Sequence, residues 1–115
     1  MRDGDRDLRV VLITVGSREA GESLAESLVE ERLAACGNVI PGVVSVYRWE
    51  GEMHRDPEAL LILKTTSGCL SLLISRVREL HDYDVPEVLA LPIVGGMEEY
   101  MEWVRQECGE ATKGG

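Results

Sequence analysis

The chain has 115 residues, of which 44% are hydrophobic and 29% charged, a composition typical of a soluble globular protein with one hydrophobic core. Its formal net charge of −9 argues against binding to nucleic acid, because phosphates attract clustered Lys and Arg side chains. The three cysteines include no C-x-x-C pair, and neither a signal-peptide core nor an apolar run of membrane length occurs. Together these features favour a cytoplasmic protein with no membrane partner.

The first third of the chain predicts a strand followed by a helix. Residues 1–7 are charged and are expected to form a flexible tail, and the β-branched run 8–15 predicts a strand. Ser17 can cap the next element, in which a single apolar stripe predicts a helix from residue 18 to about residue 35.

The middle of the chain predicts two antiparallel strands. The first covers 36–49, and Pro41-Gly42 marks an edge or a bulge because proline has no N–H for the strand ladder. A turn is predicted at Glu50-Gly51-Glu52, and the apolar run 58–65 predicts the second strand. The polar segment between them is expected to place His54 in a hairpin loop. A connection this short implies an antiparallel pair.

The last third of the chain predicts a helix, a strand and a C-terminal helix. Thr66 and Ser67 are expected to cap a second helix, and a fourth strand over 87–94 precedes a third helix over 97–108. The resulting βαββαβ order predicts an α+β fold, a ferredoxin-like sandwich with an additional C-terminal helix.

We expect one domain over 8–108 and a second flexible tail over 109–115. Several strands are apolar on both sides, which predicts that the open face of the sheet is buried in an oligomer.

The densest chemistry lies in the sequence HDYDVPE, residues 81–87. His81 falls at the end of the second helix, where the helix dipole favours a cation. Imidazole is also the commonest transition-metal ligand, and Asp82, Asp84 and Glu87 are close in sequence. A helix cap and a metal ligand both remain open for His81.

The cysteines differ in their surroundings. Cys36, at a helix–strand junction, is either a small buried hydrophobe or a ligand for a soft metal such as copper. Cys69 falls in the first turn of the second helix, where the dipole could lower its pKa. No ligand spacing surrounds Cys69 or Cys108, so both are expected to be buried packing residues.

Two interpretations are open for each of Tyr83, Glu87 and Lys64. Val85-Pro86 directs Glu87 onto the fourth strand, and the hydroxyl of Tyr83 could reach a buried carboxylate. A structural pair of tyrosine and glutamate and a ligand contact are both open. Lys64 ends a buried strand, where it either extends its amine to solvent or binds an anionic group. No phosphate loop and no nucleophile–base pair occurs in the sequence, so an enzyme is not expected.

Three segments taken together resemble the CutA family of divalent-cation tolerance proteins. They are EERLAACGNVIPGVVSVYRWEGE (30–52), LILKT and LHDYDVPEVLALPI, in the same order and spacing. The resemblance implies a ferredoxin-like subunit in a homotrimer, related in architecture to the PII signalling proteins, whose ligands lie in clefts between subunits. It also implies tolerance to divalent cations and binding of copper.

The resemblance suggests roles for individual residues. Cys36 and His81 match the family's cysteine and histidine and are the expected metal ligands. The residues that match positions around the inter-subunit cleft are Tyr47, Trp49, Lys64, Tyr83 and Glu87. We therefore expect a cytoplasmic, homotrimeric divalent-cation tolerance protein that binds divalent copper and needs no cofactor to fold. The alternative is a PII-like signalling module that binds a small molecule or a protein partner in the cleft.

Overall fold

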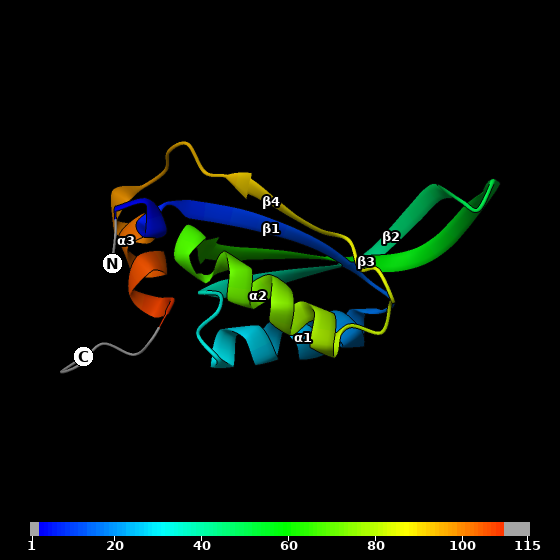
Figure 1. Ribbon diagram of the computed structural model, residues 1–115, viewed down its shortest axis with the longest axis horizontal. Helices are drawn as coiled ribbons and strands as arrows, with labels where there is room; N and C mark the ends of the chain where they lie inside the picture. The colour runs from blue at the N-terminus through cyan, green and yellow to red at the C-terminus, as the bar shows by residue number, and fades with distance from the viewer. Residues whose placement is uncertain (1–2, 110–115) are drawn as a thin grey trace.

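The computed structural model describes residues 3–109, which form one four-stranded sheet with helices on one face (Figure 1). The strands are β1 (Leu8–Val15), β2 (Cys36–Trp49), β3 (Glu52–Thr66) and β4 (Val88–Pro92). The helices are η1 (Asp3–Arg6, a 3-10 helix), α1 (Arg18–Glu30), α2 (Ser67–Leu80) and α3 (Glu98–Glu107). The strand order is β2-β3-β1-β4, and each neighbouring pair is antiparallel. The predicted α+β, ferredoxin-like arrangement with a C-terminal helix is confirmed.

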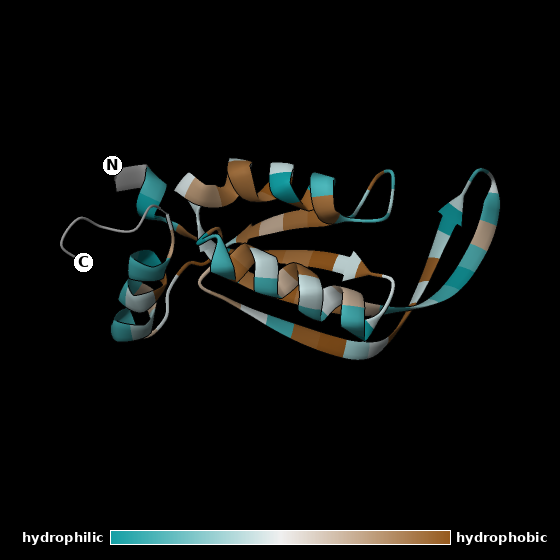
Figure 2. Cartoon of the chain, turned by 90° about the horizontal axis from the view of Figure 1, so that it is seen from below, coloured by the Kyte–Doolittle hydropathy of each residue, from teal (hydrophilic) through white to brown (hydrophobic). Residues whose placement is uncertain are grey.

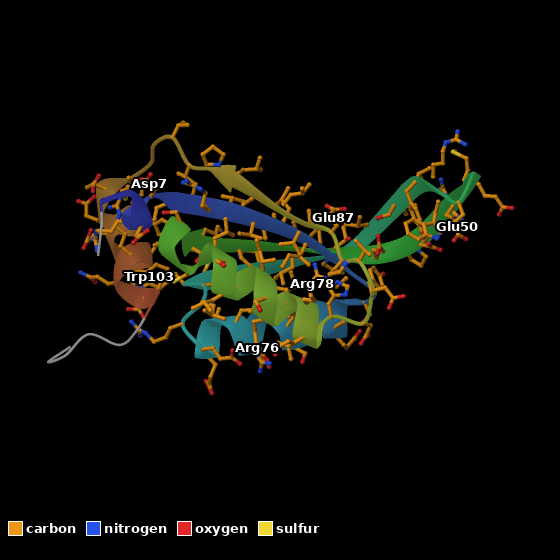
Figure 3. The ribbon with its side chains drawn as sticks, in the orientation of Figure 1. Asp7, Glu50, Arg76, Arg78, Glu87 and Trp103 are labelled. Atoms are coloured by element: carbon orange, nitrogen blue, oxygen red, sulfur yellow. The ribbon has the colours of Figure 1, made fainter. Side chains whose placement is uncertain are left out.

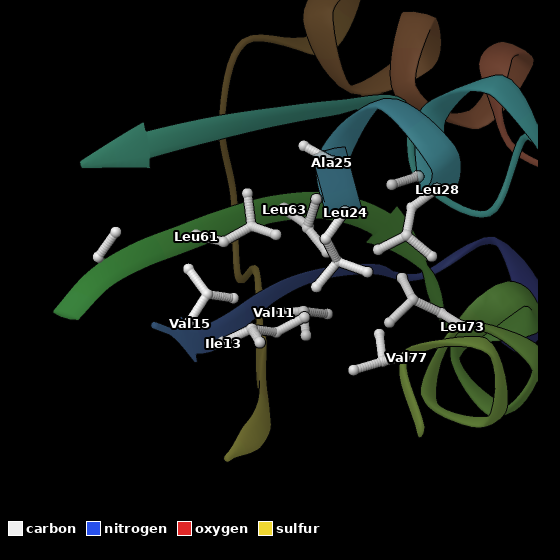
Figure 4. Close-up of a cluster of buried hydrophobic side chains, with 12 residues drawn as sticks. Val11, Ile13, Val15, Leu24, Ala25, Leu28, Leu61, Leu63, Leu73 and Val77 are labelled. Atoms are coloured by element: carbon white, nitrogen blue, oxygen red, sulfur yellow. The ribbon is translucent and has the colours of Figure 1, made fainter. Parts of the chain in front are cut away.

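The main core lies between the sheet and the pair formed by α1 and α2 (Figure 4). Alternate residues of the central strands β1 and β3 point into this core, because successive side chains of a strand face opposite sides of the sheet. Each fully buried Leu or Val side chain stabilises the fold by roughly 1.5–3 kcal/mol. The largest buried contributors are Val11, Ile13, Leu61 and Leu63 from the strands, and Leu24, Leu28, Leu73 and Val77 from the helices.

On the opposite face of the sheet, α3 covers only the end at Leu8 and Cys36. The rest of this face is apolar, and within residues 3–109 neither α1 nor α2 packs on it. Val10 and Leu12 of β1 lie on this open face, and the register pairs them with Leu91 and Leu89 of β4. Leu89 is 56% exposed and Leu91 48% exposed. Figure 2 shows the corresponding apolar stretches, in brown, along the strands. The chain by itself therefore leaves a hydrophobic surface open to water.

A long hairpin projects beyond the rest of the molecule (Figure 1). With the hairpin included, the molecule measures 51 × 25 × 22 Å. β1 pairs with β3 only over residues 59–66, so residues 52–58 pair with β2 alone. We call residues 43–58 the hairpin arm. The register shifts between Ile40 and Val43, where Gly42 has a φ of 79°, so the predicted irregularity at Pro41-Gly42 is confirmed.

The arm corrects one prediction. β3 begins at Glu52, not at residue 58, and His54 lies in this strand with its ring stacked on Tyr47 at 5.3 Å. Glu50 and Gly51 form the predicted turn, with φ values of 51° and 80°, as a two-residue hairpin turn of the mirror-image type requires. The segment appeared to be a loop because its side chains are polar, but a strand beyond the core needs no apolar face.

Helix ends also differ from expectation. α1 ends at Glu30 rather than near residue 35, because Arg32 adopts a left-handed conformation with φ of 62°. Ser17 caps α1 by accepting a hydrogen bond from the N–H of Ala20 at 3.1 Å, as predicted. The cap predicted for α2 is wrong in part, since the Thr66 side chain makes no cap hydrogen bond.

The predicted N-terminal tail is wrong for residues 3–7. Asp3–Arg6 form η1, and the carbonyl of Asp7 accepts a hydrogen bond from the N–H of Ser67 at 2.7 Å. The guanidinium of Arg6 lies 3.3 Å from the carboxylate of Glu102 on α3. Gly109, the first residue of the predicted C-terminal tail, donates its N–H to the carbonyl of Arg32 at 2.8 Å. Residues 1–2 and 110–115 of the predicted tails lie outside the described residues. Within 3–109, no helix is long and apolar enough to cross a membrane.

Gly37 offers a test of the packing between α1 and the sheet. A Cβ at Gly37 would lie 2.8 Å from Cδ2 of Leu63 and 3.2 Å from Cβ of Ala25. We expect Gly37→Ala to lower the free energy of unfolding by about 1–3 kcal/mol, as overpacking does. Gly95→Ala is the control, because a Cβ there meets no atom within 4 Å. Equal denaturant midpoints for the two variants would contradict this account of the packing.

Candidate functional site

The loop between α2 and β4 is attached to β1 through His81. The Nε2 atom of His81 lies 2.8 Å from the carbonyl oxygen of Thr14, and Nδ1 accepts a hydrogen bond from the N–H of Tyr83 at 3.1 Å. Because Nδ1 accepts, Nε2 carries the proton and donates to Thr14. The imidazole therefore has a hydrogen-bond partner on each nitrogen. A metal bound to His81 has to replace one of these partners.

Two tyrosines make short hydrogen bonds to carboxylates of β3. The hydroxyl of Tyr83 donates to Glu58 at 2.6 Å, and that of Tyr47 donates to Asp56 at 2.5 Å. The hydrogen bond to Glu58, followed by burial, raises the pKa of Tyr83 to about 12. The hydrogen bond to Asp56 likewise raises the pKa of Tyr47. Both phenols therefore stay neutral and hold their carboxylates in place.

These pairs border a cleft of about 440 Å³ between the hairpin arm and the loop 81–87. Four residues predicted for the cleft line it: Tyr47, Trp49, Tyr83 and Glu87. Figure 3 shows Glu87 close to the point where the arm leaves the sheet. The structure thus brings together side chains from β2, β3 and the loop after α2. The partner of Tyr83 is Glu58, not Glu87 as a local pair would have it.

Lys64 does not line this cleft. Its amine lies 3.6 Å from the sulfur of Cys36 and donates a hydrogen bond to the side-chain oxygen of Asn38. The Cys36 sulfur is also 3.7 Å from the hydroxyl of Tyr100. This group sits at the opposite end of the sheet from the cleft, so the five residues predicted for the cleft lie at two separate places in the chain.

The two predicted metal ligands are also separated. Cys36 pairs with Lys64, which pairs with Val10 of β1, whereas His81 contacts Thr14 of the same strand. Four residues along a strand span about 13 Å, too far for one ion. Among residues 3–109 there is no group of three or more His, Cys, Asp or Glu side chains that could hold a metal. Within one chain, the described residues therefore form no metal-binding site.

Two residues of the site escaped the sequence analysis. Asp56 and Glu58 fell within or beside a segment interpreted as a loop, yet they alternate along β3 and face the same side as Tyr47. Their two-residue spacing is the signal that could have identified them, had the polar segment been read as a strand.

The comparison with known proteins identifies the family. The sequence profile of the CutA1 divalent ion tolerance protein matches residues 9–107. The chain belongs to the CutA1 divalent ion tolerance family. This confirms the resemblance found in the sequence, and the description of the family names tolerance to divalent ions rather than a chemical reaction.

Relatives of this chain occur in bacteria and plants. The divalent-cation tolerance protein CutA of Thermus thermophilus is 53% identical over 100 residues, covering 87% of this chain and 97% of the relative. The chloroplastic protein CutA of Arabidopsis thaliana is 54% identical over 96 residues, covering 84% of this chain. The chain spans only 53% of that plant protein.

Solved CutA1 structures share the fold. The Thermus thermophilus structure has a TM-score of 0.87 at 52% identity and covers 89% of this chain and 99% of its own. The Oryza sativa structure has a TM-score of 0.88 at 49% identity, with coverages of 90% and 95%. The ferredoxin-like subunit expected of a CutA protein is therefore present here.

The pair formed by Tyr83 and Glu58 has a measurable pH signature. Because folding raises the pKa of Tyr83 from its ordinary value of 10, the pair contributes stability that is complete below pH 10 and lost as the pH rises towards about 12. In an ultraviolet titration of tyrosinate, we expect a phenol that ionises near pH 12. This transition should vanish in Tyr83→Phe and move towards lower pH in Glu58→Gln.

Tyr100→Phe serves as the control, because Tyr100 lies beside Cys36 at the other end of the sheet. It should retain the transition that Tyr83 produces. An unchanged titration in Glu58→Gln would show that the carboxylate does not raise the pKa of Tyr83.

Proposed function

We propose that this protein is a cytoplasmic homotrimer that acts in tolerance to divalent cations and binds a divalent metal such as copper with donors from more than one subunit. The separation of Cys36 and His81 within one chain carries the proposal. An ion that uses both side chains has to lie between two copies of the chain. Membership of the CutA1 family supports the role in tolerance.

The open face of the sheet supports the assembly. Ile40, Leu89 and Leu91 are between 43% and 56% exposed in a single subunit. Contiguous apolar surface of this kind marks an interface. The arm adds an edge, since residues 52–58 of β3 pair only with β2 and leave one side of the strand without a partner. Further copies of the same chain can cover both surfaces.

The cysteines support a reducing compartment. Cys36, Cys69 and Cys108 are free thiols in the structure. Free thiols persist in the cytoplasm, whereas secreted proteins tend to oxidise them.

The oligomeric state tests the assembly. In light scattering coupled to size-exclusion chromatography, wild type should have three times the 12.7 kDa mass of the chain. Leu89→Glu places a charge on the open face and should yield a folded monomer. Leu72→Glu is the matched control, because Leu72 is 65% exposed on α2, away from the open face, and should stay trimeric. Monomeric wild type would overturn the proposal.

Calorimetric titration with Cu²⁺ tests the metal site. We expect His81→Ala and Cys36→Ala each to weaken binding at least tenfold, since each removes a donor. His54→Ala, at the only other histidine, should bind as wild type does. The monomeric Leu89→Glu variant should lose the site altogether. Undiminished binding by that monomer would show that the donors do not come from different subunits.

A second function, a PII-like module that binds a small molecule, is favoured by the lining of the cleft. The cleft presents three aromatic rings, Tyr47, Trp49 and Tyr83, together with the carboxylates of Glu58 and Glu87. Among residues 3–109, no Lys, Arg or His side chain lines the cleft. Aromatic faces and carboxylates attract organic cations, whereas a nucleotide would need basic groups for its phosphates. We therefore assign this candidate ligand a positive charge.

Fluorescence of Trp49 tests the second function. In a Trp103→Phe background, with metal removed by a chelator, titration with the polyamine spermidine should give a saturable change. Glu87→Gln should weaken this response, because the variant removes a charge from the cleft. An equal response to a nucleoside triphosphate, or none to spermidine, would rule out the cationic ligand.

A further inference from the structure

Cys69 and Cys108 lie together in a second buried cluster, apart from the cleft. Cys69 is in the first turn of α2 and Cys108 directly follows α3, and the two pack with Leu8, Ala35 and Val104. They are only 6% and 7% exposed. The Cys69 sulfur donates to the carbonyl of Arg32 and the Cys108 sulfur to the hydroxyl of Thr65, each at 3.8 Å. The N–H of Gly109, next to Cys108, donates to the same carbonyl of Arg32. Residues 39 positions apart in the sequence therefore bring two thiols close together in one cluster, where they interact.

The surroundings give the two thiols different properties. The interaction with Cys108, and then those with Thr66, Thr65 and the backbone of Gly109, outweigh burial and lower the pKa of Cys69 to about 6. The same contact, together with burial, raises the pKa of Cys108. Of the two thiols, Cys69 is therefore the one that loses its proton more readily. An acidic thiol beside a protonated partner is the arrangement of redox-active cysteine pairs.

A small oxidant has access to Cys69. The residue lines a cavity of about 370 Å³ whose wall also includes Arg32, Leu33 and Leu72. Cys108 is not among the residues that line this cavity. Cys69 is therefore the sulfur that a reagent meets first, and Cys108 lies behind it.

We propose that Cys69 and Cys108 form a peroxide-sensitive dithiol that closes into an intramolecular disulfide. The Cys69 thiolate attacks one oxygen of hydrogen peroxide, so that an S–O bond forms, the O–O bond breaks and the departing hydroxide takes up a proton to become water. The sulfur of Cys108 then loses its proton and attacks the sulfenic sulfur. The S–S bond forms, the S–O bond breaks and a second water leaves. Two thiols are oxidised by two electrons while one peroxide is reduced to two waters.

The third cysteine has no place in this reaction. The Cys36 sulfur contacts Lys64 and Tyr100 and does not belong to the buried cluster. This separation supplies a control within the same chain. A disulfide of this kind is compatible with a cytoplasmic protein, because cytoplasmic disulfides are typically transient and redox-sensing.

Peptide mapping tests the proposal on the wild-type protein. The folded chain is treated with stoichiometric hydrogen peroxide, its remaining thiols are alkylated, and its peptides are analysed without reduction. We expect a bridge between the peptides that carry Cys69 and Cys108, a loss of about 2 Da per chain, and reversal by dithiothreitol. Oxidation of Cys69 only to the sulfinic acid, or a bridge between subunits, would overturn the proposal.

Variants assign the roles of the two sulfurs. Cys69→Ser and Cys108→Ser should each abolish the bridge, whereas Cys36→Ser should form it as wild type does. The rate at which iodoacetamide alkylates Cys69 should be half-maximal near pH 6 in wild type. Cys108→Ser removes the interaction with the largest effect and should move this midpoint to higher pH. A midpoint that does not differ between the two proteins would exclude the paired thiols.

Discussion

The antiparallel register between β1 and β3 sets apart the two ends of the sheet at which the functional side chains lie. It pairs Leu12 with Ile62 and Val15 with Ala59, which places one set of alternate residues in the core and the other on the open face. A slip of one residue would exchange the two faces. The same register separates the end of the sheet that carries Cys36 from the end that contacts His81. The division of chemistry between two sites follows from this pairing.

The loop 81–87 depends on contacts with both central strands. His81 donates to the backbone of β1, and Tyr83 donates to Glu58 of β3, so the loop is attached at two points before β4 begins. These contacts orient the chain that carries Glu87 beside the hairpin arm. The hydrogen bonds that make His81 structural are therefore the ones that shape the cleft. A metal that took His81 as a ligand would alter the cleft as well.

Local patterns were sufficient for the order of elements but not for the contacts between distant segments. Apolar periodicity predicted the strands and helices, and family resemblance predicted four of the residues that line the cleft. The polar half of β3 was missed because strand pairing in the arm relies on backbone hydrogen bonds rather than on an apolar face. The contact of Tyr83 with Glu58 joins residues 25 positions apart, and no pattern of periodicity signals such a pair.

The dithiol and one wall of the cleft belong to one continuous segment of chain. Cys69 and Cys108 lie near the two ends of a segment that includes α2, the loop 81–87, β4 and α3. Both ends of this segment already contact Arg32 in the folded state. Cys69 donates to its carbonyl, and its guanidinium donates to the carbonyls of Gly109 and Gln106. A disulfide would therefore add a covalent tie without requiring a new arrangement of the elements. Because the tied segment carries one wall of the cleft, we infer that the redox state of the thiols constrains the same segment whose loop contacts a ligand.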